Sequence, residues 1–222
     1  MHDERVSAEF ISAAPVVPSA YSDAAAPYAA PAAPERETSA RGLIIFLNGT
    51  SSSGKTSIAQ ELLRILDDPF FHMPVDAFHA MRTGRELAPG DLPAVLRRTW
   101  MGYHRAVAGM AAAGNNVVVD HVLSEPWRLR DCLSLFRPMD VVLVGVHCPR
   151  EELERRERDR GDRPLGLAAR QLDQVHRHGV YDIECDTGRF TPAQCAQHLK
   201  EFLADRPLPT AFQRLWDVGP RG

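Results

Sequence analysis

Residues 43–56 read LIIFLNGTSSSGKT, and residues 57–66, which follow directly, read SIAQELLRIL. The first run is apolar up to Asn48, as in a buried strand, and in the second run the apolar residues recur at helical spacing. The turn between the two runs fits the pattern G-x-x-x-x-G-K-[ST]. The sequence therefore predicts a strand, a phosphate-binding loop and a helix in direct succession.

Each residue type in this loop has a separate physical role. Gly49 and Gly54 let the backbone adopt conformations that a Cβ would oppose, so successive N–H groups converge on phosphate oxygens at the positive end of the helix dipole. Lys55 is placed to reach the β- and γ-phosphates, and Thr56 is placed to offer its hydroxyl to Mg²⁺. We expect ATP to contact Gly49, Thr50, Ser51, Ser52, Ser53, Gly54, Lys55, Thr56 and Ser57. The alternative is a Ser/Gly connector between a buried strand and a helix.

The composition limits the classes of partner. The chain has 222 residues and a net charge of -3, so no excess of positive charge favours nucleic acid. It contains no apolar run of the ~20 residues that cross a bilayer, and its N-terminus leads into no secretory h-region. Its 4 cysteines are far apart in the sequence, as is typical of reduced thiols. We expect a cytoplasmic protein without a nucleic-acid or membrane partner, and homo-oligomerisation stays open.

The chain divides into three segments by composition. Residues 1–40 are rich in Ala, Pro and Ser. Repeated proline denies them helix and ladder hydrogen bonds, which predicts a disordered tail. Residues 41–206 have the length and periodic patterns of one compact domain. Residues 207–222 are expected to form a C-terminal extension.

Strand-like runs alternate with runs of helical spacing in the central segment. The expected strands are 43–48, 70–75, 116–120, 140–146 and 181–186, and the expected helices after the first are 92–114, 125–136, 165–176 and one that starts with Thr191 as N-cap. Because several strands are apolar throughout, they indicate a parallel sheet covered on both faces. The predicted fold class is α/β: a P-loop NTPase three-layer sandwich with a mainly parallel five-stranded sheet, kinase-like, with a lid segment.

One aspartate follows the second expected strand. Ligands of parallel sheets bind at the C-terminal ends of the strands, so Asp76 is expected to face the phosphates. We assign Asp76 as the base that takes the proton from an attacking hydroxyl and orients that oxygen in line. The alternative is an aspartate that caps the next turn.

A second aspartate ends the strand of residues 116–120, which resembles a Walker B strand. The Asp120 carboxylate is a candidate ligand of Mg²⁺, directly or through water, together with Thr56. Apolar runs that end in Asp are common, so a structural role is the alternative. We interpret the neighbouring His121 as structural.

Residues 150–163 are highly charged. Their Glu–Arg pairs at i,i+4 spacing predict a solvated helix and account for Arg155, Arg156 and Arg158. Arg160 and Arg163 are left over, in the position where small-molecule kinases carry a lid. We assign both as ligands of the transferring phosphate.

Several large side chains between residues 78 and 127 are candidates for an acceptor pocket. They are Phe78, Met81, Trp100, Tyr103 and Trp127. An aromatic acceptor would suit such a lining, but residues of this kind at such spacing are more often core.

Together, these motifs resemble the chloramphenicol phosphotransferase family over about residues 43–204. The matching segments, in order, are NGTSSSGK at 48–55, VD at 75–76, VVVD at 117–120, VGVHC at 144–148, RGDR at 160–163, VH at 175–176, YD at 181–182 and DT at 186–187. The resemblance implies an ATP-dependent O-phosphotransferase with a kinase-like P-loop fold. It also implies that Asp76 deprotonates the primary hydroxyl of chloramphenicol and that the product is the inactive phosphate ester.

The leading hypothesis is an enzyme that uses ATP and Mg²⁺ to phosphorylate a small-molecule hydroxyl, with chloramphenicol or a related compound as acceptor. A sugar or nucleoside kinase of the same fold is the first alternative. A nucleotide-binding switch is the second, although the chain lacks the N-K-x-D and D-x-x-G motifs of guanine-specific switches. A structural module comes last, because it would leave Lys55, Asp76 and Asp120 without a purpose.

Overall fold

The computed structural model describes residues 41–84, 88, 90–160 and 166–218. Two predictions fall outside these residues: the tail at 1–40 and the role of Arg163. A third falls partly outside them, because Arg160 is described only as the last residue of a helix.

Five strands form one parallel sheet. They are β1 (Ile44–Asn48), β2 (Phe70–Pro74), β3 (Asn116–His121), β4 (Val141–His147) and β5 (Ile183–Asp186), in the order β2-β3-β1-β4-β5. β1 therefore lies at the centre, and its apolar residues are fully buried. The run that decides the fold is thus the middle of the sheet.

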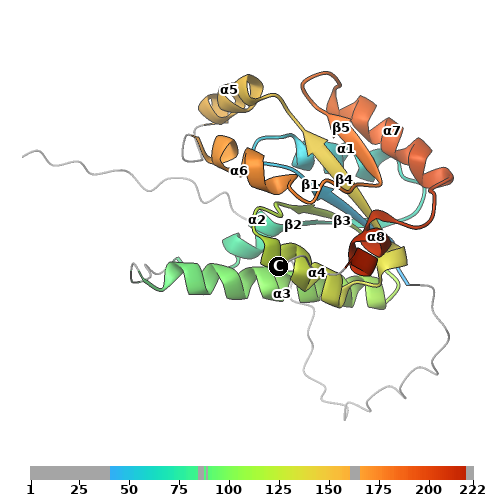
Figure 1. Cartoon of the computed structure of the whole chain (residues 1–222), viewed down its shortest axis with the longest axis horizontal. Coiled ribbons are helices and arrows are strands. Elements are labelled where there is room, and N and C mark those ends of the chain that lie inside the picture. The colour runs from blue at the N-terminus through green and yellow to red at the C-terminus, as the bar shows by residue number, and fades with distance from the viewer. Residues whose placement is uncertain (1–40, 85–87, 89, 161–165, 219–222) are drawn as a thin grey trace, which may run out of the picture. The chain divides into compact units, whose positions relative to one another are not determined.

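Helices connect the strands and cover both faces of the sheet. They are α1 (Lys55–Ile65), α2 (Val75–Ala80), α3 (Leu92–Ala112), α4 (Pro126–Leu135), the 3-10 turn η1 (Pro138–Asp140), α5 (Arg150–Arg160), α6 (Leu167–Val175), α7 (Pro192–Ala204) and α8 (Ala211–Val218). Figure 1 shows α1 and α7 on one face and α3, α4 and α8 on the other.

Successive residues of β1 supply two separate apolar cores, because side chains of a strand alternate between its faces. Ile44 and Phe46 pack in the core beneath α3, α4 and α8. Ile45 and Leu47 pack in the core beneath α1 and α7. This three-layer arrangement confirms the predicted fold class.

Several element boundaries differ from the predicted ones by one or two residues, and one of these shifts changes the position of a site residue. The second strand ends at Pro74, one residue earlier than predicted, and α2 begins at Val75. Pro74 keeps extended backbone angles (φ -78°, ψ 134°) as the N-cap of α2, and its ring donates no hydrogen bond to continue the ladder. Asp76 therefore lies in the first turn of a short helix rather than at a strand end.

Two further features of the chain are local to its C-terminal part. α7 starts at the predicted N-cap Thr191, and Thr191 and Gln194 exchange hydrogen bonds in a capping box. α8 lies within the segment expected as an extension, and its Phe212 is fully buried against Phe46 and Phe136. Over the ranges that the structure describes, no helix has the length and apolar character needed to cross a membrane.

Candidate active site

The glycines of the phosphate-binding loop are required by its geometry. The loop runs so close to β4 that a Cβ at Gly49 would lie 2.4 Å from the carbonyl oxygen of Val146. Gly54 has φ +93° where it N-caps α1, a conformation that glycine adopts without steric cost. The predicted strand, loop and helix are therefore present, with the backbone of the loop at the N-terminus of α1.

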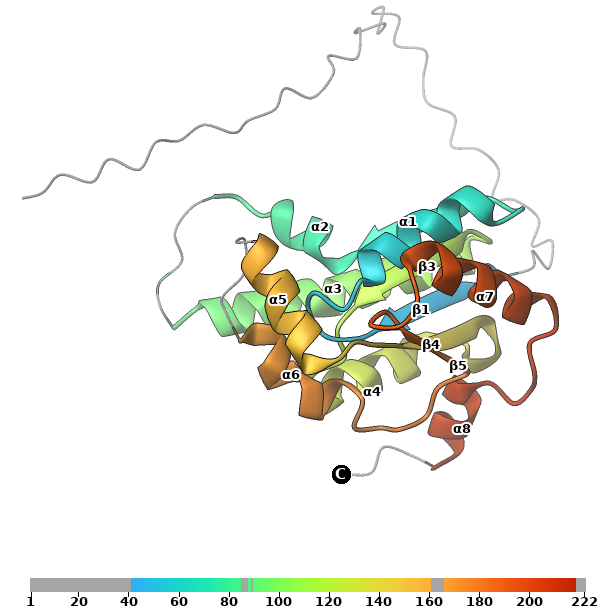
Figure 2. The same cartoon turned by 90° about the horizontal axis from the view of Figure 1, so that it is seen from above.

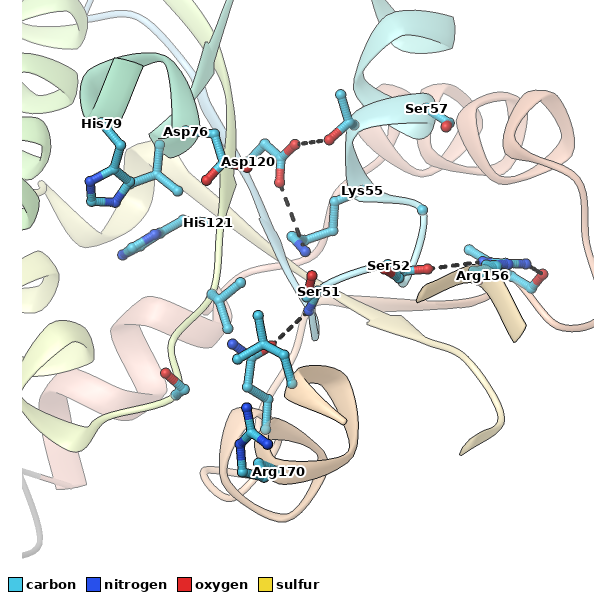
Figure 3. A pocket seen from close by; sticks show the side chains of 18 of the residues that line it. Ser51, Ser52, Lys55, Ser57, Asp76, His79, Asp120, His121, Arg156 and Arg170 are labelled. Atoms are coloured by element: carbon cyan, nitrogen blue, oxygen red, sulfur yellow. Dashed lines mark hydrogen bonds and ion pairs between the residues drawn. The ribbon is translucent and has the colours of Figure 1, made fainter. Parts of the chain in front are cut away.

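A lysine, a hydroxyl and a carboxylate meet at the start of α1. Lys55 Nζ donates a hydrogen bond to Thr50 O (2.7 Å) and lies 3.9 Å from Asp120 Oδ1. The hydroxyl of Thr56 donates to Asp120 Oδ2 at 2.5 Å. Asp120 reaches them because β3 pairs with β1 and places it opposite Leu47. Figure 3 shows the contact between Lys55 and Asp120 in the cavity.

One cavity of about 900 Å³ contains both the loop and the expected base. On the loop side it is lined by Ser51, Ser52, Gly54, Lys55, Thr56 and Ser57, and on the other side by Val75, Asp76, His79 and Trp100. Asp76 reaches it because the β2–β3 pairing sets Pro74 opposite Asp120. In Figure 3, Asp76 and Asp120 enter the same part of the cavity. The structure thus brings together Lys55, Thr56, Asp76 and Asp120, as the sequence predicted.

The helices on either side of the expected lid lie next to the phosphate-binding loop (Figure 2 shows α5 and α6 beyond the end of the sheet toward which β1 runs). Gln171 of α6 accepts a hydrogen bond from the backbone N–H of Ser51 at 2.7 Å. The buried carboxylate of Glu157 in α5 accepts from the N–H groups of Gly166 and Ala168, at 2.9 and 2.7 Å. α6 is therefore tied both to the phosphate-binding loop and to α5.

Arg156 lies on the charged helix that the sequence predicts, and it also contacts the phosphate-binding loop. Its predicted i,i+4 contact with Glu152 exists at 2.8 Å. The same guanidinium also lies 3.4 Å from Ser52 O and donates to Thr187 O at 2.9 Å. Thr187 in turn donates its hydroxyl to Ser53 O at 2.8 Å. Arg156 and Thr187 lie far from the loop in sequence, so no local pattern could have revealed these contacts.

The arginines assigned to the lid are not placed at the loop by the described structure. Arg160 is the last residue of α5, and Arg163 lies outside the described residues. Their roles stay predictions. Arg155, Arg156 and Arg170 are the arginines of α5 and α6 that line the cavity, among side chains that the structure describes.

Of the five large side chains considered for an acceptor pocket, Trp100 lines the cavity. Phe78 and Tyr103 pack in the core with ring centroids 5.0 Å apart, and Met81 is 74% exposed. Trp127 packs against Trp100, at 6.1 Å between centroids. The core alternative therefore holds for Phe78 and Tyr103, while Trp100 both packs against the same core and lines the cavity.

An arginine that sequence reasoning missed completes the wall around Trp100. The guanidinium of Arg128 stacks 3.7 Å from the centroid of the Trp100 ring. Arg128 donates to Val122 O at 2.9 Å and pairs with Glu125. Arg128 is 7% exposed and its guanidinium is held by these contacts, so it orients the Trp100 ring. Both side chains line the cavity and form an aromatic–cation wall.

Two buried histidines adjoin this wall. His104 and His121 face each other with their Nε2 atoms 3.1 Å apart, and His104 Nδ1 lies 2.7 Å from Asp131 Oδ2. Burial lowers the pKa of both rings, that of His121 well below its ordinary value. His121 is also one of the residues that line the cavity.

The sequence model of the chloramphenicol phosphotransferase-like family matches residues 42–204. The chain belongs to the chloramphenicol phosphotransferase-like family. This confirms the predicted resemblance and, with the loop geometry, the expectation of a phosphotransferase.

Two relatives from Mycobacterium tuberculosis, one from strain H37Rv and one from strain CDC 1551, carry names that describe them as O-phosphotransferases. Each is 31% identical to this family member over 200 residues, covering 78% of this chain and 88% of the relative.

Solved structures agree in fold. The APS kinase of M. tuberculosis, in complex with AMPPNP and APS, has a TM-score of 0.58 at 18% identity and covers 74% of this chain and 99% of its own. Shikimate kinase from Acinetobacter baumannii has a TM-score of 0.54 at 15% identity, covering 77% and 98%. The tunicamycin resistance protein of Deinococcus radiodurans has a TM-score of 0.53 at 19% identity, and the match covers 73% of this chain and 96% of that protein. At these identities the likeness concerns the fold alone.

Proposed function

We propose that this family member transfers the γ-phosphoryl group of ATP to a hydroxyl of a small molecule, with chloramphenicol or a related compound as acceptor. The observation that carries the proposal is the shared cavity, in which Asp76 faces the phosphate-binding loop and the Thr56–Asp120 pair. A carboxylate in that place is suited to proton transfer from an alcohol, a reaction that a nucleotide-binding switch does not need.

The loop residues fit the phosphates of ATP. The loop that begins at Gly49 runs so close to β4 that a side chain at residue 49 would collide with it. The same loop leads into the N-terminus of α1. Such a site suits several negative charges. The ammonium group of Lys55, buried at the same place, would neutralise β/γ-phosphate charge.

The donor set beside the loop fits Mg²⁺. The Thr56 hydroxyl and the Asp120 carboxylate already converge, and a hard cation prefers oxygen ligands of this kind. In the described segments no group of three or more His, Cys, Asp or Glu forms a complete protein cage for a metal. Mg²⁺ held by Thr56 and Asp120 would therefore keep ligands from phosphate and water, and it would supply charge neutralisation to the transferring group.

Asp76 is the proposed base. Its carboxylate would accept the proton of the attacking hydroxyl and hold the oxygen toward the terminal phosphate. We also propose that Arg160 and Arg163 bind the transferring phosphate from the lid, in the manner expected of guanidinium groups. Arg156 supports them by holding α5 against Ser52 and Thr187.

The wall formed by Trp100 and Arg128 favours an acceptor with an aromatic or flat part, because a large ring face and a guanidinium stack well against such groups. Chloramphenicol has such a ring, and the family name supports it. A cytoplasmic location, expected from the sequence, suits an enzyme that consumes ATP.

The test is direct product analysis. The full chain is incubated with Mg-ATP and chloramphenicol, and mass spectrometry detects the added phosphate. A phosphorylated drug supports the proposal. An unmodified drug, with ATP consumed in the presence of sugars or nucleosides, would replace the acceptor by a metabolite. ATP binding without phosphorylation of any alcohol would contradict phosphoryl transfer itself.

A further inference from the structure

His121 lines the active-site cavity and has a nitrogen atom without a hydrogen-bond partner. Its ring follows Asp120 at the end of β3 and is 1% exposed. Its Nε2 atom contacts His104, but its Nδ1 atom is buried without a hydrogen-bond partner. In Figure 3 the ring lies on the same side of the cavity as Asp76 and His79.

A chain of hydrogen bonds fixes which nitrogen atoms carry protons. The carboxylate of Asp131 only accepts, so His104 Nδ1 must donate to it across 2.7 Å. In the neutral ring of His104, Nε2 is then an acceptor. The facing Nε2 of His121, 3.1 Å away, must donate to it. In the neutral ring of His121, Nδ1 is consequently left with a lone pair and no proton.

Lys55 and Arg128, two cations whose charge acts on His121, form hydrogen bonds with other groups. Lys55 Nζ donates to Thr50 O, and Arg128 donates to Val122 O and pairs with Glu125. Buried polar atoms in folded proteins nearly always have a partner, because leaving one unpaired is unfavourable. A buried acceptor that lines a substrate cavity is therefore suited to a donor that arrives with the substrate.

We infer that His121 is a specificity-determining residue whose Nδ1 atom accepts a hydrogen bond from a second donor of the acceptor substrate, a hydroxyl or an N–H beside the hydroxyl that is phosphorylated. The inference rests on the proposed function. It narrows the acceptor class to diols, amino alcohols and hydroxy amides, as opposed to compounds with one hydroxyl and no other donor. Asp131 and His104 are positioning residues, because they act by fixing the proton on His121 Nε2.

The first test is independent of any substrate. In ¹⁵N NMR spectra of the labelled full chain, bare and protonated imidazole nitrogens have well-separated shifts, and the His121 signals are assigned by their loss in His121→Phe. We expect a bare Nδ1 and a protonated Nε2. A protonated Nδ1 in the wild-type protein would overturn the inference, since that atom could no longer accept a hydrogen bond.

The second test measures discrimination. Pairs of alcohols are compared that differ only in the second donor and contain no N–H group, beginning with a phenylpropanediol and the phenylpropanol that lacks its secondary hydroxyl. For the wild-type enzyme we expect kcat/KM to favour the compound with two donors by about 10- to 100-fold, as an unpaired buried polar group costs roughly this much. In His121→Phe the ratio should approach one, through loss of activity on the two-donor compound only.

His198→Phe, a change of the same kind on the exposed side of α7, is the matched control and should leave the ratio unchanged. Equal losses on both compounds in His121→Phe would show that His121 acts only in packing, and a preference retained in His121→Phe would show that another group binds the second donor. Either result overturns the inference. If no alcohol is phosphorylated at all, the proposed function fails, while the NMR result still decides whether Nδ1 is an acceptor.

Discussion

Lys55 has two roles at the loop, and both depend on its ammonium group. It donates to Thr50 O within the loop, and it lies 3.9 Å from the Asp120 carboxylate. The hydrogen bond to Thr50 O stabilises the conformation of the loop. The positive charge of the ammonium group would interact with the phosphates. A substitution that keeps the length of the side chain but removes the charge separates charge from packing.

Lys55→Met should therefore lower kcat/KM by about 10²-fold or more, a loss typical of removing a group that stabilises transition-state charge. The measurement is steady-state phosphoryl transfer, with a thermal melt to show that the protein still folds. The other lysine of the chain, Lys200, contacts Ile65 O and Asp67 far from the cavity. Lys200→Met is the control and should change the rate by less than about two-fold. A Lys55→Met enzyme as active as this control would refute the charge role.

The local part of the site could be predicted from sequence, and the non-local part could not. One short stretch contains Gly49, Gly54, Lys55 and Thr56, and their spacing alone predicts a phosphate-binding loop. The contacts of Arg156 with Ser52 and Thr187 join residues 104 and 31 positions apart. Only the packing of α5 on the loop creates them, so the i,i+4 pattern of the charged helix accounted for one of the three residues that this side chain contacts.

At the scale of elements, the start of α7 could be predicted from its local sequence, and the structure has the helix start at the predicted residue. Thr191 accepts from Gln194 N, the Gln194 side chain accepts from Thr191 N, and Pro192 occupies the first turn. These contacts satisfy N–H groups that the helix itself cannot pair.

Thr191→Ala should cost about 1 kcal/mol of unfolding free energy, because it removes the hydroxyl that caps α7. Urea unfolding, followed by circular dichroism, measures this value. Thr99→Ala removes a hydroxyl bonded to Val95 O within α3 and should change stability by less than about 0.5 kcal/mol. Equal effects of the two changes would show that the capping box contributes nothing.

α2, in contrast, is a helix that the local sequence pattern did not predict. Residues 75–80 form a helix although residues 70–75 have a strand-like pattern. The helix follows from Pro74, which ends the ladder, and from the burial of Val75 in the core beneath α3. A six-residue helix has too few turns to show apolar periodicity, so its presence depends on packing that the sequence pattern does not reveal.

At the scale of the whole molecule, the five parallel strands are held between two cores, and the C-terminal helix supplies part of one core. Phe212 of α8 is 0% exposed and contacts the rings of Phe46 and Phe136. Thr210 and Asp182 hold the start of α8, through hydrogen bonds to Pro138 O and from Ala211 N respectively. Removal of α8 would therefore open the core beneath β1.

Phe212→Ala should destabilise the protein by about 3–5 kcal/mol, the cost of deleting a fully buried phenylalanine ring. Trp216→Ala on the same helix is the control, since Trp216 is 54% exposed and its loss should cost less than about 1 kcal/mol. Both values come from chemical unfolding. A Phe212→Ala change that costs no more than the control would mean that α8 does not stabilise the domain.

Asp76 is the side chain that distinguishes phosphoryl transfer to an alcohol from nucleotide binding alone. The decisive measurement compares kcat for alcohol phosphorylation and the Kd for ATP in Asp76→Asn and in Asp67→Asn, a surface change on an 86% exposed side chain. We expect Asp76→Asn to lower kcat by about 10²-fold or more while the Kd for ATP changes by less than about three-fold, and Asp67→Asn to change neither. Phosphorylation by Asp76→Asn at the wild-type rate would contradict the proposed mechanism.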